Sequence, residues 1–244
     1  MVNIRQNLVD SSKYNIKCPH EMNAEFIVVH NTANDASANN EIEYMKSNNN
    51  KVSFHYAVDD TEIVQGIPEN RNAWHAGDGN GNGNRKGIAI EICYSKSGGE
   101  RFDKAEENAA EFIASKLKEK GWTIDKVKKH QDFANKYCPH RTLDYGWERC
   151  LNKIREQLGL QTKPIEDNKD YSGGSDEPVR TYVNGSTIEN IYADTSLTKK
   201  IGYLNPRESC DCFGIFNGRP MVRYKVDGSN NYKIGFAKWT GGVK

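Results

Sequence analysis

Three side chains in this sequence could bind a metal ion together. His130 and Cys138 lie eight positions apart, and His30 ends an apolar run far upstream. Imidazole nitrogen and thiolate sulfur suit a borderline-soft cation such as zinc, and three protein ligands leave a fourth position open for a reacting water. The tight ligand pairs of a structural zinc finger are absent from the sequence. Taken alone, the His130 and Cys138 spacing is more typical of a buried cysteine beside a surface histidine.

One carboxylate lies in an otherwise apolar stretch. Residues 87–93 predict a central strand, and Glu91 is the single charged residue within it. Glutamate is rarely buried without a partner. Glu91 therefore either faces water from an edge strand, or points into a pocket where a metal ion or a reacting water satisfies it.

Two other segments resemble ligand sites but have plainer interpretations. His55 lies between aromatic residues in a predicted strand; it could be a third metal ligand, although a hydrogen-bonded core histidine is the commoner case. The asparagine- and glycine-rich run 78–84 partly matches a calcium loop, but Ala89 occupies the position of its bidentate glutamate. We expect no calcium site and predict a flexible surface loop over 78–84.

The spacing of apolar residues predicts the elements that position these groups. Apolar or alternating runs predict strands over 24–30, 53–58, 62–65 and 87–93. Helices are predicted over 38–47, over 103–120 and over about 146–158, the last with Trp147, Leu151, Ile154 and Leu158 as its core stripe. Ser37 caps the first helix, and Asp103 with Glu106 forms a capping box for the second. This order indicates the α/β class, with a central mixed β-sheet flanked by helices.

The last third of the chain has a different character. Residues 161–177 are rich in polar residues, glycine and proline and predict a linker. Beyond them, short strand-like runs are separated by Asn184-Gly185, Asn217-Gly218 and Asp227-Gly228, dipeptides that favour tight hairpin turns. We therefore predict a first domain at 1–160, a linker at 161–177 and a small all-β barrel at 178–244.

Composition limits the setting in which the protein works. Over 244 residues, 34 basic and 33 acidic residues nearly balance, but residues 178–244 carry a net charge of +5 and are the part best suited to an anionic surface. Six scattered cysteines do not form a dense disulfide framework, so we expect most to be reduced. The sequence contains neither a recognisable signal peptide nor an apolar run of membrane-spanning length. We expect synthesis in the cytoplasm, no stable membrane association and no nucleic-acid ligand.

Five segments, taken in order, resemble a known enzyme family. They are 26–33, 54–60, 73–77, 88–93 and 130–141. Together they are similar to the zinc-dependent N-acetylmuramoyl-L-alanine amidases of the type 2 amidase and peptidoglycan-recognition superfamily, in particular phage endolysins. The resemblance covers about residues 20–158, and five ordered motifs are more specific than any one of them.

The resemblance implies roles for individual residues. It implies Zn²⁺ ligands at His30, His130 and Cys138, with Glu91 handling the proton of the attacking water and Lys136 facing the substrate carbonyl. The implied substrate-binding residues are Asn31, Thr32, Trp74 and His75. Either Lys136 or a ring nitrogen of His75 would offset the charge that develops on the carbonyl oxygen.

One departure from the family concerns a tyrosine. Some relatives have this residue just before the histidine that corresponds to His55, whereas this chain has Phe54 there and carries the hydroxyl on Tyr56. We do not expect Tyr56 to replace the missing group, which leaves Glu91 as the group that transfers the proton.

The tail is similar to the bacterial SH3-like modules that bind cell walls. The resemblance implies a peptidoglycan hydrolase that cuts between N-acetylmuramic acid and L-alanine and acts on the bacterial wall after release, with a monomeric catalytic half. Two alternatives remain open: a non-catalytic peptidoglycan receptor of the same fold, which Cys138 disfavours, and a host autolysin, which the missing signal peptide disfavours.

Overall fold

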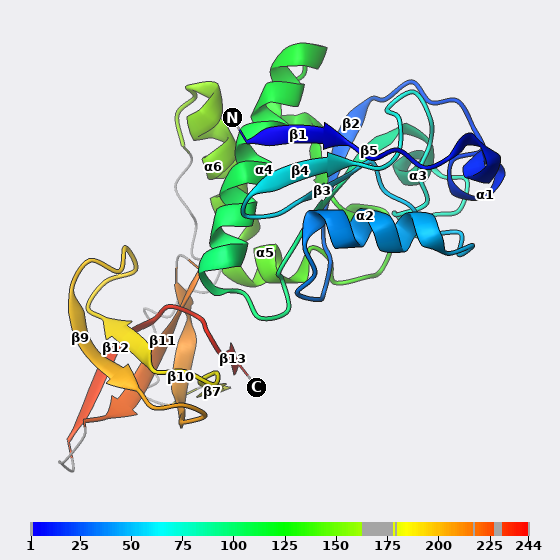
Figure 1. The fold of residues 1–244 in the computed structure, drawn as a ribbon. Helices are drawn as coiled ribbons and strands as arrows, with labels where there is room; N and C mark the ends of the chain where they lie inside the picture. The colour runs from blue at the N-terminus through cyan, green and yellow to red at the C-terminus, as the bar shows by residue number, and fades with distance from the viewer. Residues whose placement is uncertain (1, 163–177, 179, 217, 227–230, 244) are drawn as a thin grey trace. The chain divides into compact units, whose positions relative to one another are not determined.

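The computed structural model describes residues 2–162, 178, 180–216, 218–226 and 231–243, and these form two compact units (Figure 1). The first unit comprises Met1–Leu143 and Cys150–Thr162, and the second comprises Asp144–Arg149 and Lys163–Lys244. Most of the predicted linker 161–177 lies outside the described residues. None of the described helices is long and apolar enough to cross a membrane. The six cysteines, all among the described residues, form no disulfide, which agrees with the prediction that most are reduced.

A mixed six-stranded sheet forms the centre of the first unit, in the order β1-β4-β3-β5-β2-β6. Its strands are β1 (Asn3–Gln6), β2 (Phe26–Asn31), β3 (Tyr56–Val58), β4 (Glu62–Gln65), β5 (Gly87–Ile92) and β6 (Val127–Lys129). Only the β3 and β4 pair is antiparallel, and these two strands form a hairpin. β2 and β5 are the apolar runs, and their Ile, Val and Ala side chains are fully buried because neighbouring strands and helices cover both faces.

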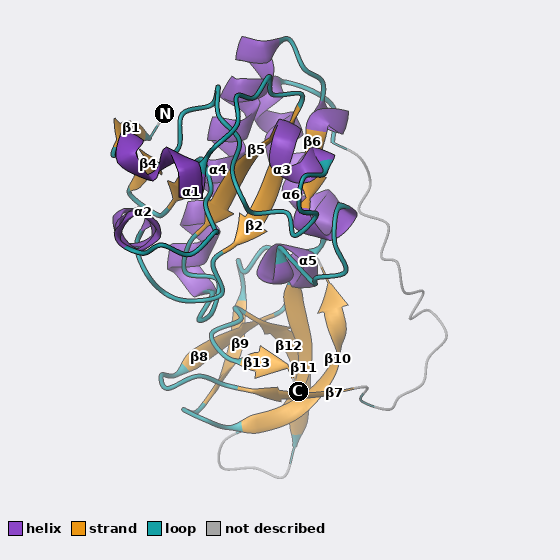
Figure 2. Cartoon of the chain, turned by 90° about the vertical axis from the view of Figure 1, so that its right-hand side faces the viewer, coloured by secondary structure: helices purple, strands orange, loops and turns teal. Residues whose placement is uncertain are grey.

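Helices cover this sheet. They are α1 (Tyr14–Lys17), α2 (Ala38–Ser47), α3 (Asn82–Lys86), α4 (Gly99–Lys120), α5 (His140–Tyr145) and α6 (Trp147–Leu158), with short 3-10 turns η1 (Ser11–Lys13), η2 (Ile124–Lys126) and η3 (His130–Asp132). Ser37 caps α2 through its hydroxyl, as predicted. In Figure 2, α4 lies behind β5 and α3 in front of it, so the central strands are enclosed.

Several predicted boundaries are wrong for physical reasons. Helix α4 begins at Gly99 rather than at Asp103, because Gly98 and Gly99 adopt positive φ values of 68° and 73° that turn the chain into the helix four residues earlier. The predicted strand 53–58 is shortened to Tyr56–Val58. Of the predicted α6 stripe, Ile154 is buried, whereas Trp147, Leu151 and Leu158 are half-buried.

A half-buried ion-pair cluster ties the loop after β4 to α4. The carboxylate of Glu69 forms ion pairs of 2.8 Å with the ammonium groups of Lys116 and Lys120 in α4. It also accepts a hydrogen bond of 2.7 Å from the Tyr56 hydroxyl. Burial alone would raise the pKa of Glu69, but the hydrogen bonds from Lys116, Lys120 and Tyr56 outweigh it and lower this pKa to about 2.

Replacing Glu69 with glutamine should therefore destabilise the fold in a pH-dependent way. Because the pKa is lower in the folded than in the unfolded chain, the carboxylate's contribution is complete above about pH 4.5 and is lost as the pH falls towards 2. We expect Glu69→Gln to lower the free energy of unfolding by about 2 kcal/mol at pH 7 and by much less near pH 3. Urea unfolding at both pH values measures this. Glu119→Gln, which removes a more exposed partner of the same lysines, should change stability little, and an equal loss for both variants would contradict the assignment.

The second unit contains a seven-stranded antiparallel sheet, in agreement with the predicted all-β barrel. Its strands are β7 (Arg180–Val183), β8 (Glu189–Tyr192), β9 (Lys200–Leu204), β10 (Ser209–Phe216), β11 (Arg219–Lys225), β12 (Tyr232–Ala237) and β13 (Gly242–Val243). Its core is a cluster of apolar side chains centred on Tyr182, Ile191, Val222 and Tyr224.

The predicted turns of this unit have different outcomes. β10 and β11, which flank the predicted Asn217-Gly218 turn, are antiparallel, but Asn217 lies outside the described residues, as does Asp227-Gly228. The Asn184-Gly185 hairpin is wrong, because β7 pairs with β10 and β13 rather than with β8. The buried Asn184 side chain instead donates hydrogen bonds to the carbonyls of Thr187, Leu204 and Asn205, which fixes a crossing between strands.

Candidate metal centre

Strand register brings three of the predicted site residues to one level of the sheet. β5, β2 and β6 are parallel neighbours, and His30 of β2 is directly paired with Glu91 of β5. Val29 is paired with Lys129, so His130 follows β6 at the level of His30. Because parallel strands end at the same edge of a sheet, residues 30, 91 and 130 meet although they are far apart in the chain.

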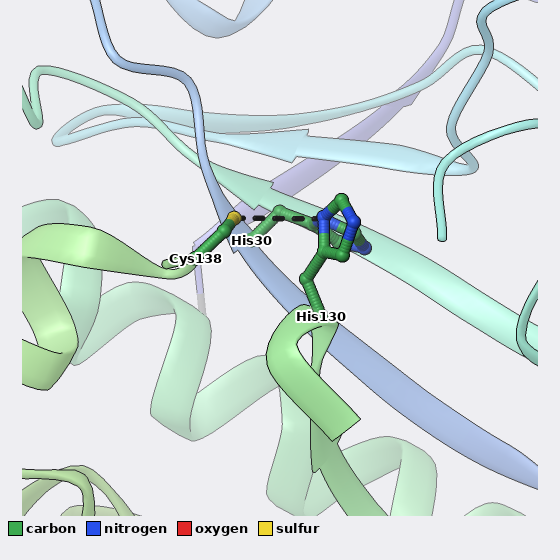
Figure 3. Close-up of side chains that lie close together, drawn as sticks. All are labelled: His30, His130 and Cys138. Carbon is green, nitrogen blue, oxygen red and sulfur yellow. Dashed lines mark hydrogen bonds between the residues drawn. The ribbon is translucent and has the colours of Figure 1, made fainter. Parts of the chain in front are cut away.

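The three predicted metal ligands form a buried group (Figure 3). The His30 Nδ1 atom lies 3.0 Å from His130 Nδ1 and 3.8 Å from Cys138 Sγ, and a ligand atom from each residue lies within 4.8 Å of the others. Each of the three residues is at most 4% exposed. This confirms that the fold brings His30, His130 and Cys138 together.

A short loop after η3 folds back and places Cys138 beside the two histidines. The Gln131 amide donates to the Cys138 carbonyl at 3.0 Å, and the Cys138 amide donates to the Lys136 carbonyl at 2.8 Å, which closes the segment after η3. Burial, followed by the nearby Glu91 carboxylate, raises the pKa of the Cys138 thiol to about 11, while the backbone of Asn31 and the Lys136 ammonium oppose this shift. A bound cation would reverse the balance, because a thiol that coordinates a metal is deprotonated.

The Glu91 carboxylate lies beside this group. Its Oε1 atom is 4.0 Å from His30 Nδ1, and its Oε2 atom is buried without a hydrogen-bond partner among the described residues. Burial raises the pKa of Glu91 to about 8; the Glu41 carboxylate adds to the shift and the Lys136 ammonium opposes it. Of the two alternatives left by the sequence, the structure therefore supports a carboxylate that points into a pocket.

A cleft of about 600 Å³ opens over these residues. It is lined by the three candidate ligands, by Glu91 and Lys136, and by Trp74, His75 and Asn31. Lys51, which the sequence did not single out, also lines the cleft, with its ammonium 4.3 Å from the centre of the Trp74 ring. The cleft therefore joins a buried polar site to an aromatic and cationic margin.

His75 lies against a candidate ligand. Its Nδ1 atom is 3.0 Å from the Nε2 atom of His30, and a turn formed by residues 78–84 fixes its backbone. The buried Asn84 side-chain oxygen accepts hydrogen bonds from the amides of His75 and Ala76. The surface loop predicted at 78–84 is therefore wrong in part: Asp78 binds the amides of Gly83 and Asn84, and the segment enters α3.

Other candidate residues take structural positions. His55 is a core histidine, since its Nε2 contacts the Arg71 carbonyl at 2.9 Å and its Nδ1 accepts from the Ala89 amide at 2.9 Å. The Tyr56 hydroxyl donates to Glu69, away from the ligands. Asn31 lines the cleft, but its side chain bonds to Thr142 and to the backbone. Thr32 is not among the described residues that line the cleft.

The donor set fits a zinc ion. Two imidazole nitrogens and one thiolate are the ligands of an open zinc site. With Zn–N bonds of about 2.0–2.1 Å and a Zn–S bond of about 2.3 Å, tetrahedral geometry places the ligand atoms roughly 3.3–3.7 Å apart. The distances of 3.0 and 3.8 Å at His30 are close to this range. The buried Glu91 Oε2 atom, which has no hydrogen-bond partner in the described parts of the chain, is a second sign that the site is built for a further polar group, because a buried polar atom without a partner is costly.

Comparison with known proteins gives one consistent result. The family described as N-acetylmuramoyl-L-alanine amidase matches residues 20–141. The N-acetylmuramoyl-L-alanine amidase CwlA of Bacillus subtilis is 59% identical over 159 residues, which cover 64% of this chain and 58% of that protein. The N-acetylmuramoyl-L-alanine amidase XlyB of the same organism is 57% identical over 201 residues, which cover 81% of this chain and 62% of that protein. The chain thus spans about three-fifths of the length of these curated relatives.

Solved structures agree with this result. The structure of PlyL is 52% identical with a TM-score of 0.62, and the match covers 63% of this chain and 97% of that chain. The catalytic domain of PlyG is 51% identical with a TM-score of 0.63, and the match covers 67% of this chain and 99% of that chain. Both similarities confirm the predicted α/β architecture of the first unit.

Proposed function

The chain belongs to the N-acetylmuramoyl-L-alanine amidase family, and from that premise we propose that it is a peptidoglycan hydrolase of the endolysin type. It cleaves the amide bond between the lactyl group of N-acetylmuramic acid and the L-alanine of the stem peptide. The observation that carries this proposal is the buried group of His30, His130 and Cys138 beside the carboxylate of Glu91, at the base of an open cleft.

In this proposal His30, His130 and Cys138 hold a zinc ion. Zinc in an open site of this kind supplies Lewis acidity, which makes water a nucleophile at neutral pH and polarises a carbonyl group. The protein supports the ion with two neutral imidazoles, since burial lowers the pKa of His30 and His130 below the usual value. Neutral rings keep the lone pairs that ligation requires.

Glu91 and Lys136 act on the reacting groups. Glu91 accepts the proton of the attacking water and delivers it to the leaving amine, a role that suits a carboxylate whose pKa lies near neutrality. Lys136 lines the cleft and lowers the pKa of Glu91, so its ammonium group acts within the same space. There it offsets the negative charge that grows on the carbonyl oxygen.

The cleft margin binds the substrate. Trp74 presents an aromatic face that suits the apolar side of a sugar or peptide, and Asn31 contributes a polar lining. Thr32 remains a weaker candidate for this role, because it lies outside the lining of the cleft.

The second unit holds the enzyme on the wall. Its small antiparallel sheet and the +5 charge of residues 178–244 suit an anionic wall ligand. A tethered binding module raises the local concentration of the catalytic unit at an insoluble substrate without altering the active site. We place the catalytic domain at 1–160, the linker at 161–177 and the wall-binding domain at 178–244.

Assays of the full protein and of residues 1–162 on two substrates test the division into a catalytic domain and a wall-binding domain. On soluble muropeptides, both should release new L-alanine amino groups at similar rates and no new reducing sugar ends. On purified walls, the shorter chain should be slower by at least about tenfold, because it lacks the tether. Amino-group and reducing-end assays on the same samples measure both effects.

The outcomes separate the parts of the proposal. A rise in reducing ends would contradict the assigned bond, and absence of any cleavage by the full chain would favour a non-catalytic receptor. Equal rates of both chains on walls would contradict the wall-binding role of residues 178–244. Direct sedimentation of residues 178–244 with walls provides the positive control for that role.

A further inference from the structure

The two ring nitrogens of His30 face different partners. Its Nδ1 atom faces His130 Nδ1 and Cys138 Sγ, at 3.0 and 3.8 Å. Its Nε2 atom lies 3.0 Å from the Nδ1 atom of His75, in a buried contact between two rings that are nearly perpendicular. The candidate ligand atom is therefore Nδ1, and Nε2 is committed to His75.

Imidazole chemistry then determines which nitrogen carries the proton. A neutral imidazole has one N–H donor and one lone pair, so a ring that ligates a metal through Nδ1 carries its proton on Nε2. The Nε2–H of His30 needs an acceptor, and at 3.0 Å that acceptor is His75 Nδ1. Metal-bound histidines are commonly oriented by such a partner at the second nitrogen, which fixes the ring and makes it a better ligand.

We propose that His75 is a positioning residue for the metal site, whose Nδ1 atom accepts a hydrogen bond from His30 Nε2–H and so directs the His30 Nδ1 lone pair at the ion. This inference rests on the zinc site of the proposed function. It gives His75 a role different from contact with substrate, because its Nδ1 atom is engaged by His30.

The surroundings of His75 hold its backbone in place. Asn84 accepts from the amides of His75 and Ala76 at 2.7 and 2.8 Å, and the Trp74 amide donates to the Ser53 hydroxyl at 2.8 Å. His75 is 9% exposed. A residue whose backbone is fixed on both sides loses little entropy when its side chain orients a neighbour. A positioning residue must meet this requirement.

His55 provides a matched control within the same core. Its ring centroid is 6.4 Å from that of His75, and both of its nitrogens are used by backbone groups of Arg71 and Ala89. Replacing His55 therefore removes a buried histidine of similar environment without touching His30. A general loss of packing would affect both variants, whereas loss of ligand orientation would affect only His75.

Zinc release from the full chain tests the proposal. Zinc-loaded wild type, His75→Leu, His75→Asn and His55→Leu are mixed with a chromogenic chelator, and each is also loaded with Co²⁺ for absorption spectra. We expect His75→Leu to release zinc about 10- to 100-fold faster and to shift the cobalt bands. His75→Asn retains an acceptor near the position of Nδ1 and should recover most of the wild-type rate. His55→Leu should keep the wild-type rate and spectrum even where its melting temperature falls.

Each result bears on one assignment. Wild-type zinc release and cobalt bands in His75→Leu would overturn the proposal, as would equal losses in His75→Leu and His55→Leu. Retained zinc with a raised KM in His75→Leu would return His75 to a substrate-binding role. If His75→Leu does not fold, the zinc release rates of His75→Asn and His75→Gln test the proposal instead, since only asparagine places its acceptor near the position of Nδ1. Equal release rates for these two variants would contradict a directed hydrogen bond. A wild-type chain that binds no zinc would contradict the proposed metal site itself.

Discussion

Replacing Cys138 with serine should remove bound zinc and amidase activity together. The serine oxygen is a much poorer ligand than thiolate for a borderline-soft ion, and the remaining donors, His30 and His130, are too few for a stable site. We expect zinc affinity to fall by at least about 100-fold and turnover by on the order of 10³-fold or more. Metal analysis of the purified variant and amino-group release from muropeptides measure the two effects.

The choice of control determines what this result means. Cys150 is equally buried but lies in α6, and it does not belong to the candidate ligand group. Cys150→Ser should keep one zinc per chain and near-normal turnover, although it costs stability because a hydroxyl replaces a buried thiol. A Cys138→Ser protein that retains one zinc per chain would contradict the assignment of Cys138 as a ligand.

Replacing Glu91 should separate chemistry from metal binding. Glu91→Gln keeps the shape of the side chain and removes its ability to accept a proton, so we expect zinc to be retained and kcat to fall by about 10²- to 10⁴-fold. The fold should not suffer, because burial raises the pKa of Glu91 and already disfavours its ionised form. Glu91→Ala should lose turnover to a similar extent and leave a small cavity.

Steady-state kinetics and metal analysis on the same preparation measure this separation. Glu41 offers a comparison, since it is the other carboxylate that raises the pKa of Glu91. Glu41→Gln should preserve most turnover, because its side chain bonds to Asn34 and it does not line the cleft among the described residues. Near-normal turnover of Glu91→Gln would remove Glu91 from the mechanism.

The residue positions that could be predicted from the sequence depend on local patterns and on parallel pairing. His30 at the end of an apolar strand and Glu91 within another are visible in hydrophobic periodicity, and both strands are where the pattern places them. Parallel neighbours then align the two residues without further information. The pairing of β2 with β6 is not visible in a short polar strand such as Val127–Lys129, so the level of His130 had to come from the structure.

The parts that sequence could not predict depend on contacts between distant segments. The 3.0 Å contact between His75 and His30 joins residues 45 positions apart, and nothing in either local sequence specifies it. Asn84 looked like part of a flexible polar run, yet its buried side chain holds His75 in position. Polar residues with structural roles are difficult to separate from loop residues by composition, because the distinction lies in their partners.

His30 in β2, Glu91 in β5 and His130 directly after β6 lie at one level of the sheet, and this alignment also affects when the proposed activity can arise. Their sequence separations are long, and only the short interval from His130 to Cys138 can close early in folding. A nascent or partly folded chain thus offers zinc a single local pair of ligands and no proton acceptor. Under the proposed function, metal capture and hydrolytic competence would arise together, when β5, β2 and β6 pair, and the unfinished chain would be catalytically inactive while it is being made.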